Sequence, residues 1–333
     1  MSTTFRKQMG WLLALGVVPL VTFAADERTC NMRDAALPTT SVTYVLCEQG
    51  LLLVTKDEGA TWLQRKIPSD TATLRAVSFH DINRGLTVGD GGAIFATEDA
   101  GATWQKRESG TKENLTDIQM IGEEGWIAGY DGVILHTADA GKTWKAQESG
   151  TALSLEAINF LDNQNGWAVG WSGTVLHTTD GGKKWQSLKL PGATWSLSAI
   201  TFTDPQHGFM VGFGGVLLAT SDGGKTWETR KPPAQAWLTS IGFDSKKRGW
   251  ITTDLGFLMS EDGGLTWKVQ PAAGQLFINR ILRHSNSNIA WALGPFGLLK
   301  QTGDGLEWKK IVNPLSSNSA DDPSPSSTPA IPK

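Results

Sequence analysis

The segment TADAGKTW, Thr137–Trp144, is one copy of an eight-residue unit, Ser/Thr-x-Asp-x-Gly-x-Thr-Trp, that recurs along this chain. The fourth copy has Lys184 in place of the Thr, and the seventh copy is one residue short. The copies end at Trp62, Trp104, Trp144, Trp185, Trp227, Trp267 and Trp308, so their separations are 42, 40, 41, 42, 40 and 41 residues. A fixed period of this length predicts a fold built from one repeated supersecondary unit.

The aspartate of each copy suits a tight turn better than a catalytic site. Its carboxylate can accept hydrogen bonds from backbone N–H groups, the Gly supplies a positive φ, and the Thr hydroxyl offers a further local bond. The Trp then opens a strand and buries its ring over the turn. We therefore assign a structural role to the seven aspartates and seven tryptophans of the repeat: Asp57, Asp99, Asp139, Asp180, Asp222, Asp262 and Asp304, with Trp62, Trp104, Trp144, Trp185, Trp227, Trp267 and Trp308.

Each period also carries four short β patterns. A Leu-x-x-Ile-x-Phe-like run such as Leu155–Phe160 comes first, and a Gly-Trp-x-x-Gly run such as Gly166–Gly170 follows it. A third apolar run ends in the Thr of the turn unit, and the residues after the Trp form the fourth. Gly-bearing turns at these intervals favour strands over helices. The sequence thus predicts an all-β fold, a seven-bladed β-propeller with four antiparallel strands per blade.

The ends of the chain differ in composition from the repeats. Arg6 and Lys7 precede the apolar run Met9–Val21, and small residues follow it, so residues 1–24 read as a cleaved signal peptide. An uncleaved membrane anchor is the alternative, but a span needs roughly 20 apolar residues. Residues 25–313 form the predicted propeller. Residues 314–333 are rich in Ser and Pro and are expected to be disordered. We expect a mature chain without a transmembrane segment, located in the periplasm.

The first repeat unit is irregular and contains both cysteines of the chain, Cys30 and Cys47. Residues 42–47 and 51–55 supply its second and third strands, and its innermost strand is expected near residues 28–33. An exported protein meets an oxidising compartment, so a disulfide is predicted between the two cysteines. Such a bridge would contribute about 3 kcal/mol and would hold the blade where the ring closes. A metal site is not expected, because two cysteines without a nearby His give too few ligands.

The turn units and the runs that precede them resemble known families. The turn unit is similar to the bacterial neuraminidase repeat, or Asp box. The combination with Gly166–Gly170 and Gly173–Gly182 resembles the photosystem II stability and assembly factor family, over residues 29 to 312. The resemblance implies a seven-bladed propeller, lumenal or periplasmic, that helps newly made membrane subunits to assemble. It implies neither enzyme activity nor a cofactor. Cyanobacterial members of this family tend to carry a lipoprotein signal, which is not expected in this chain. Relatives of the family also occur in non-photosynthetic bacteria, where the client differs.

Charge and residue spacing argue against several other functions. The chain has 30 basic and 33 acidic side chains, and this balance gives no support for nucleic-acid binding. The main catalytic alternative is a sialidase-like glycoside hydrolase, which needs a Tyr nucleophile with an acid. Tyr44 and Tyr130 are the only tyrosines, and Glu123 and Glu124 are the acids near Tyr130 in sequence. Hydrolysis generally needs a pair of carboxyl groups across a cleft, and the sequence pairs none. A glycan-binding module is the alternative among binding functions.

Residues that break the repeat are the candidates for partner binding. Trp195 and Trp237 stand just before innermost strands, and Trp171 and Phe213 follow the second strands. Exposed aromatic residues suit a binding anchor, although packing between blades is the alternative. Charged residues also fall inside innermost strands, where they would line a channel or pair with one another: Arg75, Asp117, Glu156 and Arg280. We expect a monomer that binds a membrane-protein complex or its subunits.

Overall fold

The structure is a computed structural model that describes residues 30–69, 72–190, 195–244, 247–254, 256–270, 278–283, 289–295, 297–301 and 308–311. The predicted signal peptide, 1–24, and tail, 314–333, lie outside the described residues, as does Asp304 of the seventh turn unit. Within the described part, no helix is both long enough and apolar enough to cross a membrane.

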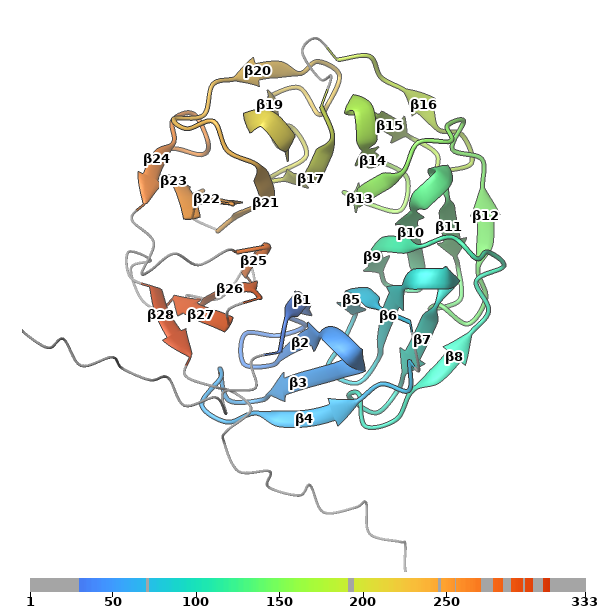
Figure 1. Ribbon diagram of the computed structural model, residues 1–333. Helices are drawn as coiled ribbons and strands as arrows, with labels where there is room; N and C mark the ends of the chain where they lie inside the picture. The colour runs from blue at the N-terminus through green and yellow to red at the C-terminus, as the bar shows by residue number, and fades with distance from the viewer. Residues whose placement is uncertain are drawn as a thin grey trace, which may run out of the picture.

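Seven antiparallel sheets, each of four strands, surround a central axis, so the predicted seven-bladed propeller is confirmed (Figure 1). Blades are numbered here in chain order. The first three contain β1 (Met32–Ala36), β2 (Thr43–Cys47), β3 (Leu51–Thr55) and β4 (Leu63–Lys66); β5 (Leu74–Phe79), β6 (Gly85–Gly89), β7 (Ile94–Thr97) and β8 (Gln105–Arg107); and β9 (Leu115–Ile121), β10 (Glu124–Gly129), β11 (Ile134–Thr137) and β12 (Lys145–Gln147).

The other four blades repeat this order, with the first strand innermost and the last strand outermost (Figure 1). They contain β13 (Leu155–Phe160), β14 (Gly166–Gly170), β15 (Val175–Thr178) and β16 (Gln186–Ser187); β17 (Leu197–Phe202), β18 (Gly208–Gly212), β19 (Leu217–Thr220) and β20 (Glu228–Arg230); β21 (Leu238–Phe243), β22 (Gly249–Thr253), β23 (Gly256–Ser260) and β24 (Lys268–Gln270); and β25 (Arg280–Arg283), β26 (Ala290–Gly294), β27 (Gly297–Gln301) and β28 (Trp308–Ile311).

The second strand of each blade is buried on both faces, because a neighbouring blade covers each side of the sheet. All five residues of β14 are buried, for example, and Trp167 packs between the rings of His177 and Phe202. The outermost strands are exposed and polar, as in β12. Apolar content therefore falls from the centre of each blade to its outer edge.

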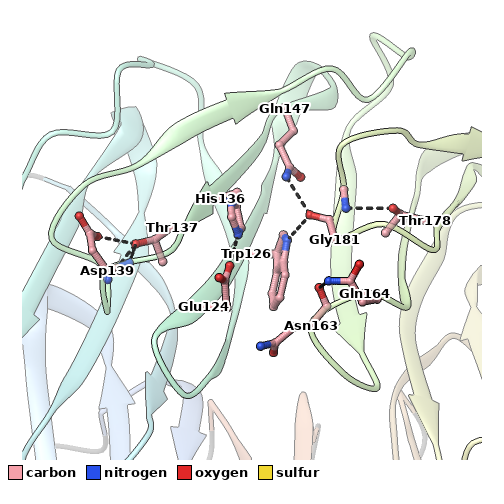
Figure 2. A network of polar contacts seen from close by, with 12 residues as sticks. Glu124, Trp126, His136, Thr137, Asp139, Gln147, Asn163, Gln164, Thr178 and Gly181 are labelled. Carbon is pink, nitrogen blue, oxygen red and sulfur yellow. Dashed lines mark hydrogen bonds and ion pairs between the residues drawn. The ribbon is translucent and has the colours of Figure 1, made fainter.

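The turn unit has the hydrogen bonds that its sequence predicts. Asp139 Oδ1 accepts from the Thr137 hydroxyl at 2.8 Å (Figure 2). The same oxygen accepts from the backbone N–H of Thr143 at 2.8 Å. Asp139 Oδ2 accepts from the Thr143 hydroxyl at 2.6 Å, and this bond is the main reason that the pKa of Asp139 falls to about 2. Two residues in succession have positive φ, Ala140 at 59° and Gly141 at 79°, whereas the sequence predicts only the glycine.

The turn unit also joins each blade to the one before it. In blade 4, the carbonyl oxygen of Gly181 accepts hydrogen bonds from Trp126 Nε1 at 3.1 Å and Gln147 Nε2 at 3.0 Å, both of blade 3 (Figure 2). A Cβ on the glycine at the fifth position of the unit would collide with a side chain of the preceding blade in six units: Gly59 with Trp291, Gly101 with Leu52, Gly141 with Leu86, Gly182 with Gln147, Gly224 with Trp167, and Gly264 with Phe209.

The ring closes between blades 1 and 7, whose strands come from opposite ends of the described chain (Figure 1). The rings of Trp62 and Trp291 meet edge to face, with centroids 5.7 Å apart, and Lys300 donates a hydrogen bond to the backbone of Glu58. The innermost strand, β1, overlaps the expected region near residues 28–33 at Met32 and Arg33 and continues to Ala36. Met32 takes the buried place that Leu holds in other blades.

Cys30 and Cys47 lie next to each other in this first blade, with Cα atoms 5.6 Å apart. Such a separation suits a disulfide. The pairing ties the segment before β1 to the end of β2, next to the blade 7 interface. The predicted bridge would therefore limit fraying of the strand on which ring closure depends.

The collision at Gly141 predicts the cost of filling the turn unit. The Gly141→Ala substitution should lower the free energy of unfolding by about 3 kcal/mol, because it adds a clash with Leu86 to the strain of a positive φ. Gly150→Ala is the matched control, because Gly150 has a φ of 74° and nothing within 4 Å of its Cβ position. That control should cost about 1 kcal/mol in urea unfolding. Equal losses would mean that the turn unit does not pack on the preceding blade.

The cysteine pair predicts a covalent state. Intact-mass measurement of protein recovered from the periplasm should show the gain of two hydrogens on reduction, and a mature chain that starts near Ala25 or Asp26. Cys47→Ser should lower the free energy of unfolding by about 3 kcal/mol, because it releases the segment before β1. Two free thiols in the exported protein would contradict the bridge, and retained residues 1–24 would contradict the cleavage.

Candidate functional site

One end of the central channel is lined by equivalent positions of the seven innermost strands. In blades 1 to 6 the register of the innermost strand shifts at its second residue, which is a β-bulge. A bulge re-aims a side chain away from the regular pleat. These second residues and their blade 7 equivalent all line a cavity of about 720 Å³, which we name the mouth cavity: Arg33, Arg75, Thr116, Glu156, Ser198, Thr239 and Asn279.

A second set of side chains at this end begins the turn between the second and third strands. In the first five blades this turn is a short 3₁₀ segment: η1 (Glu48–Gly50), η2 (Asp90–Gly92), η3 (Tyr130–Gly132), η4 (Trp171–Gly173) and η5 (Phe213–Gly215). The last residue of each turn is a glycine with positive φ. The first residue carries no such backbone requirement, so it varies between blades: it is acidic in blades 1 and 2 and aromatic in blades 3 to 5.

In blades 1 and 2 the two positions form ion pairs. Arg33 pairs with Glu48, and Arg75 Nε lies 2.5 Å from Asp90 Oδ1. The guanidinium of Arg75 also lies over the ring of Tyr130, 5.5 Å from its centroid. Both arginines of the mouth cavity are therefore held by an acid of their own blade.

In blades 3 to 6 aromatic rings gather at the mouth, in a group that we name the aromatic cluster. Ring centroids are 6.1 Å apart for Tyr130 and Trp171, 5.6 Å for Trp195 and Phe213, and 5.9 Å for Phe213 and Trp237. The four largest exposed rings, Trp171, Trp195, Phe213 and Trp237, keep between 43% and 54% of their surface accessible. Phe213 contacts Trp237 of the next blade, and Trp171 contacts Tyr130 of the blade before it, yet the four rings are not buried between blades, as the packing alternative would require.

Glu156 is the one carboxylate among the described residues that line the mouth cavity. Its Oε1 accepts a hydrogen bond from Trp171 Nε1 at 2.5 Å, so the acid and the aromatic cluster are in direct contact. Burial raises the pKa of Glu156, while the bond from Trp171 and the charge of Arg75 act in the opposite direction.

Arg280 and Asp117 do not line the mouth cavity and belong to a central ion-pair cluster further along the channel. Arg280 Nε lies 2.8 Å from Asp34 Oδ1, and its Nη2 lies 3.8 Å from Asp117 Oδ1. Both carboxylates also accept backbone hydrogen bonds from a neighbouring blade, Asp34 from Val77 and Asp117 from Ile158. Burial raises the pKa of Asp34 to about 6, against the attraction of Arg280. This cluster joins blades 1, 3 and 7 across the closing point of the ring.

The structure does not bring together the tyrosine and the acid that a sialidase-like glycoside hydrolase would need. Glu124 begins β10 and pairs with His136 at 2.5 Å, whereas Tyr130 follows the other end of that strand. Tyr44 is buried, stacks on Phe79, and donates its hydroxyl to the carbonyl of Ile82 at 2.6 Å. In the part of the chain that the structure describes, no three His, Cys, Asp or Glu side chains form a group that could hold a metal ion.

A known protein family matches the part of this chain that contains the repeats. The family model for photosynthesis system II assembly factor YCF48 covers residues 62–154 and 184–269, more than half of the chain. The chain belongs to the YCF48 family. No curated protein sequence matched it.

Solved structures of the family share the propeller fold. A structure described as YCF48 bound to D1 peptide is 23% identical, covers 83% of this chain and 94% of its own, and superposes with a TM-score of 0.70. YCF48 from Cyanidioschyzon merolae is 18% identical, with coverages of 83% and 97% and a TM-score of 0.67. The WD40 propeller domain of Doa1, at 12% identity, covers 86% of this chain and 95% of its own with a TM-score of 0.66.

The matched segments of this YCF48 family member include Arg75, Trp195 and Trp237, whereas Glu156 and Trp171 fall between them. Of the residues predicted from sequence, the mouth cavity brings together Arg75, Glu156, Trp171, Trp195, Trp237 and Phe213. The prediction missed Arg33, Asn279 and the mouth position of Tyr130. Counting from the turn unit to the second residue of each innermost strand would have found Arg33 and Asn279, because all blades share that position. Tyr130 takes the same place at the start of its 3₁₀ turn as Trp171 and Phe213, which the sequence did mark.

The central ion-pair cluster predicts a pH-dependent cost for removing its cation. The folded pKa of Asp34, about 6, exceeds the ordinary value, so its burial costs stability as the pH rises from about 4 to above 6. Without Arg280 this cost grows, and Arg280→Gln should lose about 2 kcal/mol at pH 8 and much less at pH 4. Urea unfolding across this range measures the difference, and Asp34→Asn added to Arg280→Gln should flatten it. A loss independent of pH would show that Arg280 acts by packing alone.

Proposed function

We propose that this YCF48 family member is a non-catalytic assembly or accessory factor whose mouth cavity holds a segment of a membrane-protein client. It acts after export across the inner membrane, in the periplasm, or in the thylakoid lumen if its host is photosynthetic. It works as a monomer and needs no cofactor.

The aromatic cluster is the observation that carries this proposal. Four large rings remain about half exposed on one end of a molecule whose other aromatic residues are mostly buried. Exposed apolar side chains that gather at one place mark an interaction surface. Trp and Tyr residues in such a place are the residue types that most often dominate binding energy. A cavity of about 720 Å³ has room for several side chains of a peptide segment.

Family membership gives the class of client. A related structure is described as YCF48 bound to D1 peptide, so a propeller of this family holds a peptide in that case. We extend that mode of use to this chain. The client is a photosystem subunit in a photosynthetic host, and another membrane protein elsewhere.

The disposition of acids supports a binding role over hydrolysis. Glycoside hydrolysis generally uses two carboxyl groups about 5–10 Å apart. At the mouth, Glu48 and Asp90 are each paired with an arginine, and Glu156 is the one carboxylate among the described residues that line the mouth cavity. Exposed tryptophans also stack on sugars, so glycan binding is the competing outcome of the test.

Site-specific photo-crosslinking in the native host tests the proposal. A photoreactive residue at position 195 should crosslink to a membrane protein, on a segment exposed to the compartment that contains the propeller. The matched control is position 265, because Leu265 is also exposed and apolar but lies in a turn unit at the opposite end of the blades. Trp237→Ala should reduce the yield at position 195 several-fold, because it removes a ring of the aromatic cluster.

Mass spectrometry of the crosslinked product decides between the outcomes. A membrane-protein peptide found from position 195 and absent from position 265 supports the proposal. If position 195 yields no membrane protein, and the purified propeller instead retains or cleaves polysaccharides in a manner that depends on Trp195, the assembly role is wrong.

A further inference from the structure

The charges at the mouth are unevenly compensated. Arg33 and Arg75 are each neutralised by an acid in their own blade, so neither presents an unpaired positive charge to the cavity. Glu156 has no such ion pair, and the one hydrogen bond that it accepts within the described residues comes from an uncharged indole. Asp254 adds a second acid beside the aromatic cluster, where it accepts from the backbone N–H of Trp237 at 3.0 Å. The part of the mouth that contains the aromatic cluster therefore also contains two acidic side chains, Glu156 and Asp254.

Aromatic rings and a carboxylate together favour a cation. The face of a Trp, Tyr or Phe ring attracts an ammonium or guanidinium group within about 6 Å, and the attraction grows when water is excluded. The molecule already contains one such contact at this place, because the guanidinium of Arg75 covers the ring of Tyr130 at 5.5 Å. Arg75 also attracts Glu156, but its guanidinium lies against Asp90 and over Tyr130, in blades 2 and 3, whereas Trp195 and Trp237 belong to blades 5 and 6.

From this arrangement we propose that the mouth cavity selects its client segment by a basic side chain, Lys or Arg, that enters the aromatic cluster and pairs with Glu156. The inference rests on the proposed function and specifies the chemistry of the segment. An acidic segment would meet Glu156 with no unpaired arginine to compensate it. A wholly apolar segment would leave the carboxylate covered and without a cation, which is costly.

Peptide selection tests this chemistry without knowledge of the client. A phage library of random heptapeptides is panned on the mature wild-type protein and on two variants, Glu156→Gln and Glu98→Gln. Glutamine at position 156 keeps an oxygen that can accept from Trp171, so the fold is expected to survive, and thermal unfolding verifies this. Glu98 is an exposed acid of a turn unit, so Glu98→Gln makes the same change of charge outside the mouth.

The wild type and Glu98→Gln should enrich peptides with Lys or Arg at one fixed position, and Glu156→Gln should not. For a selected peptide, replacing that Lys by norleucine, or that Arg by citrulline, should weaken binding to the wild type about 10-fold by calorimetry, which corresponds to 1.4 kcal/mol. The same replacement should change binding to Glu156→Gln less than about 3-fold.

Several outcomes overturn the inference. They are enrichment of acidic residues, enrichment of apolar residues alone, an unchanged basic preference in Glu156→Gln, or no binding peptide at all. If crosslinking from position 195 nevertheless identifies a membrane protein, the assembly role stands and only the basic specificity is wrong. If crosslinking identifies none, the proposed function fails independently of the peptide result.

Discussion

The contact between each turn unit and the preceding blade is the constraint on which the rest of the structure depends. The glycine at the fifth position of the unit lies so close to a side chain of the preceding blade that even one added methyl group would collide. Gly224, for example, lies against the ring of Trp167. The same turn is held internally by its aspartate, whose carboxylate accepts from two hydroxyls and one backbone N–H. Since the turn is rigid and its contact is short, each blade fixes the position of its neighbour, and seven copies form a closed ring.

This constraint separates structural from variable positions. The turn units of the first six blades lie at one end of the blades, and the second and third strands are buried between neighbours. The positions that vary are at the other end of the channel, where the second residue of each innermost strand and the first residue of the 3₁₀ turns in blades 3 to 5 line the mouth cavity. Ion pairs in blades 1 and 2 and aromatic rings in blades 3 to 6 share one backbone geometry. Binding chemistry can thus change there without disturbing blade packing.

Closing the ring requires a further device, because no strand is shared between the first and last blades. The contact between Gly59 and Trp291 repeats the packing of the other turn units on the preceding blade, and the cluster of Arg280, Asp34 and Asp117 links three blades across the channel. The pairing of Cys30 with Cys47 holds the chain just before β1. The ion-pair cluster lies further along the channel than the mouth cavity, so it supports the shape of the cavity without occupying it.

The repeat period alone was enough to predict the number of blades, the strand order and the role of the turn units, because each depends on residues close together in sequence. It was also enough to mark Trp171, Trp195 and Trp237 as departures from the pattern. Only the tertiary structure decided that these rings share one cavity with Glu156, whereas Arg280 and Asp117 pair with Asp34 deeper in the channel. Asp34 and Arg280 are far apart along the chain, and they meet because the ring closes between the first and last blades. A local pattern carries no information about such a contact, since the positions of all seven blades together determine it.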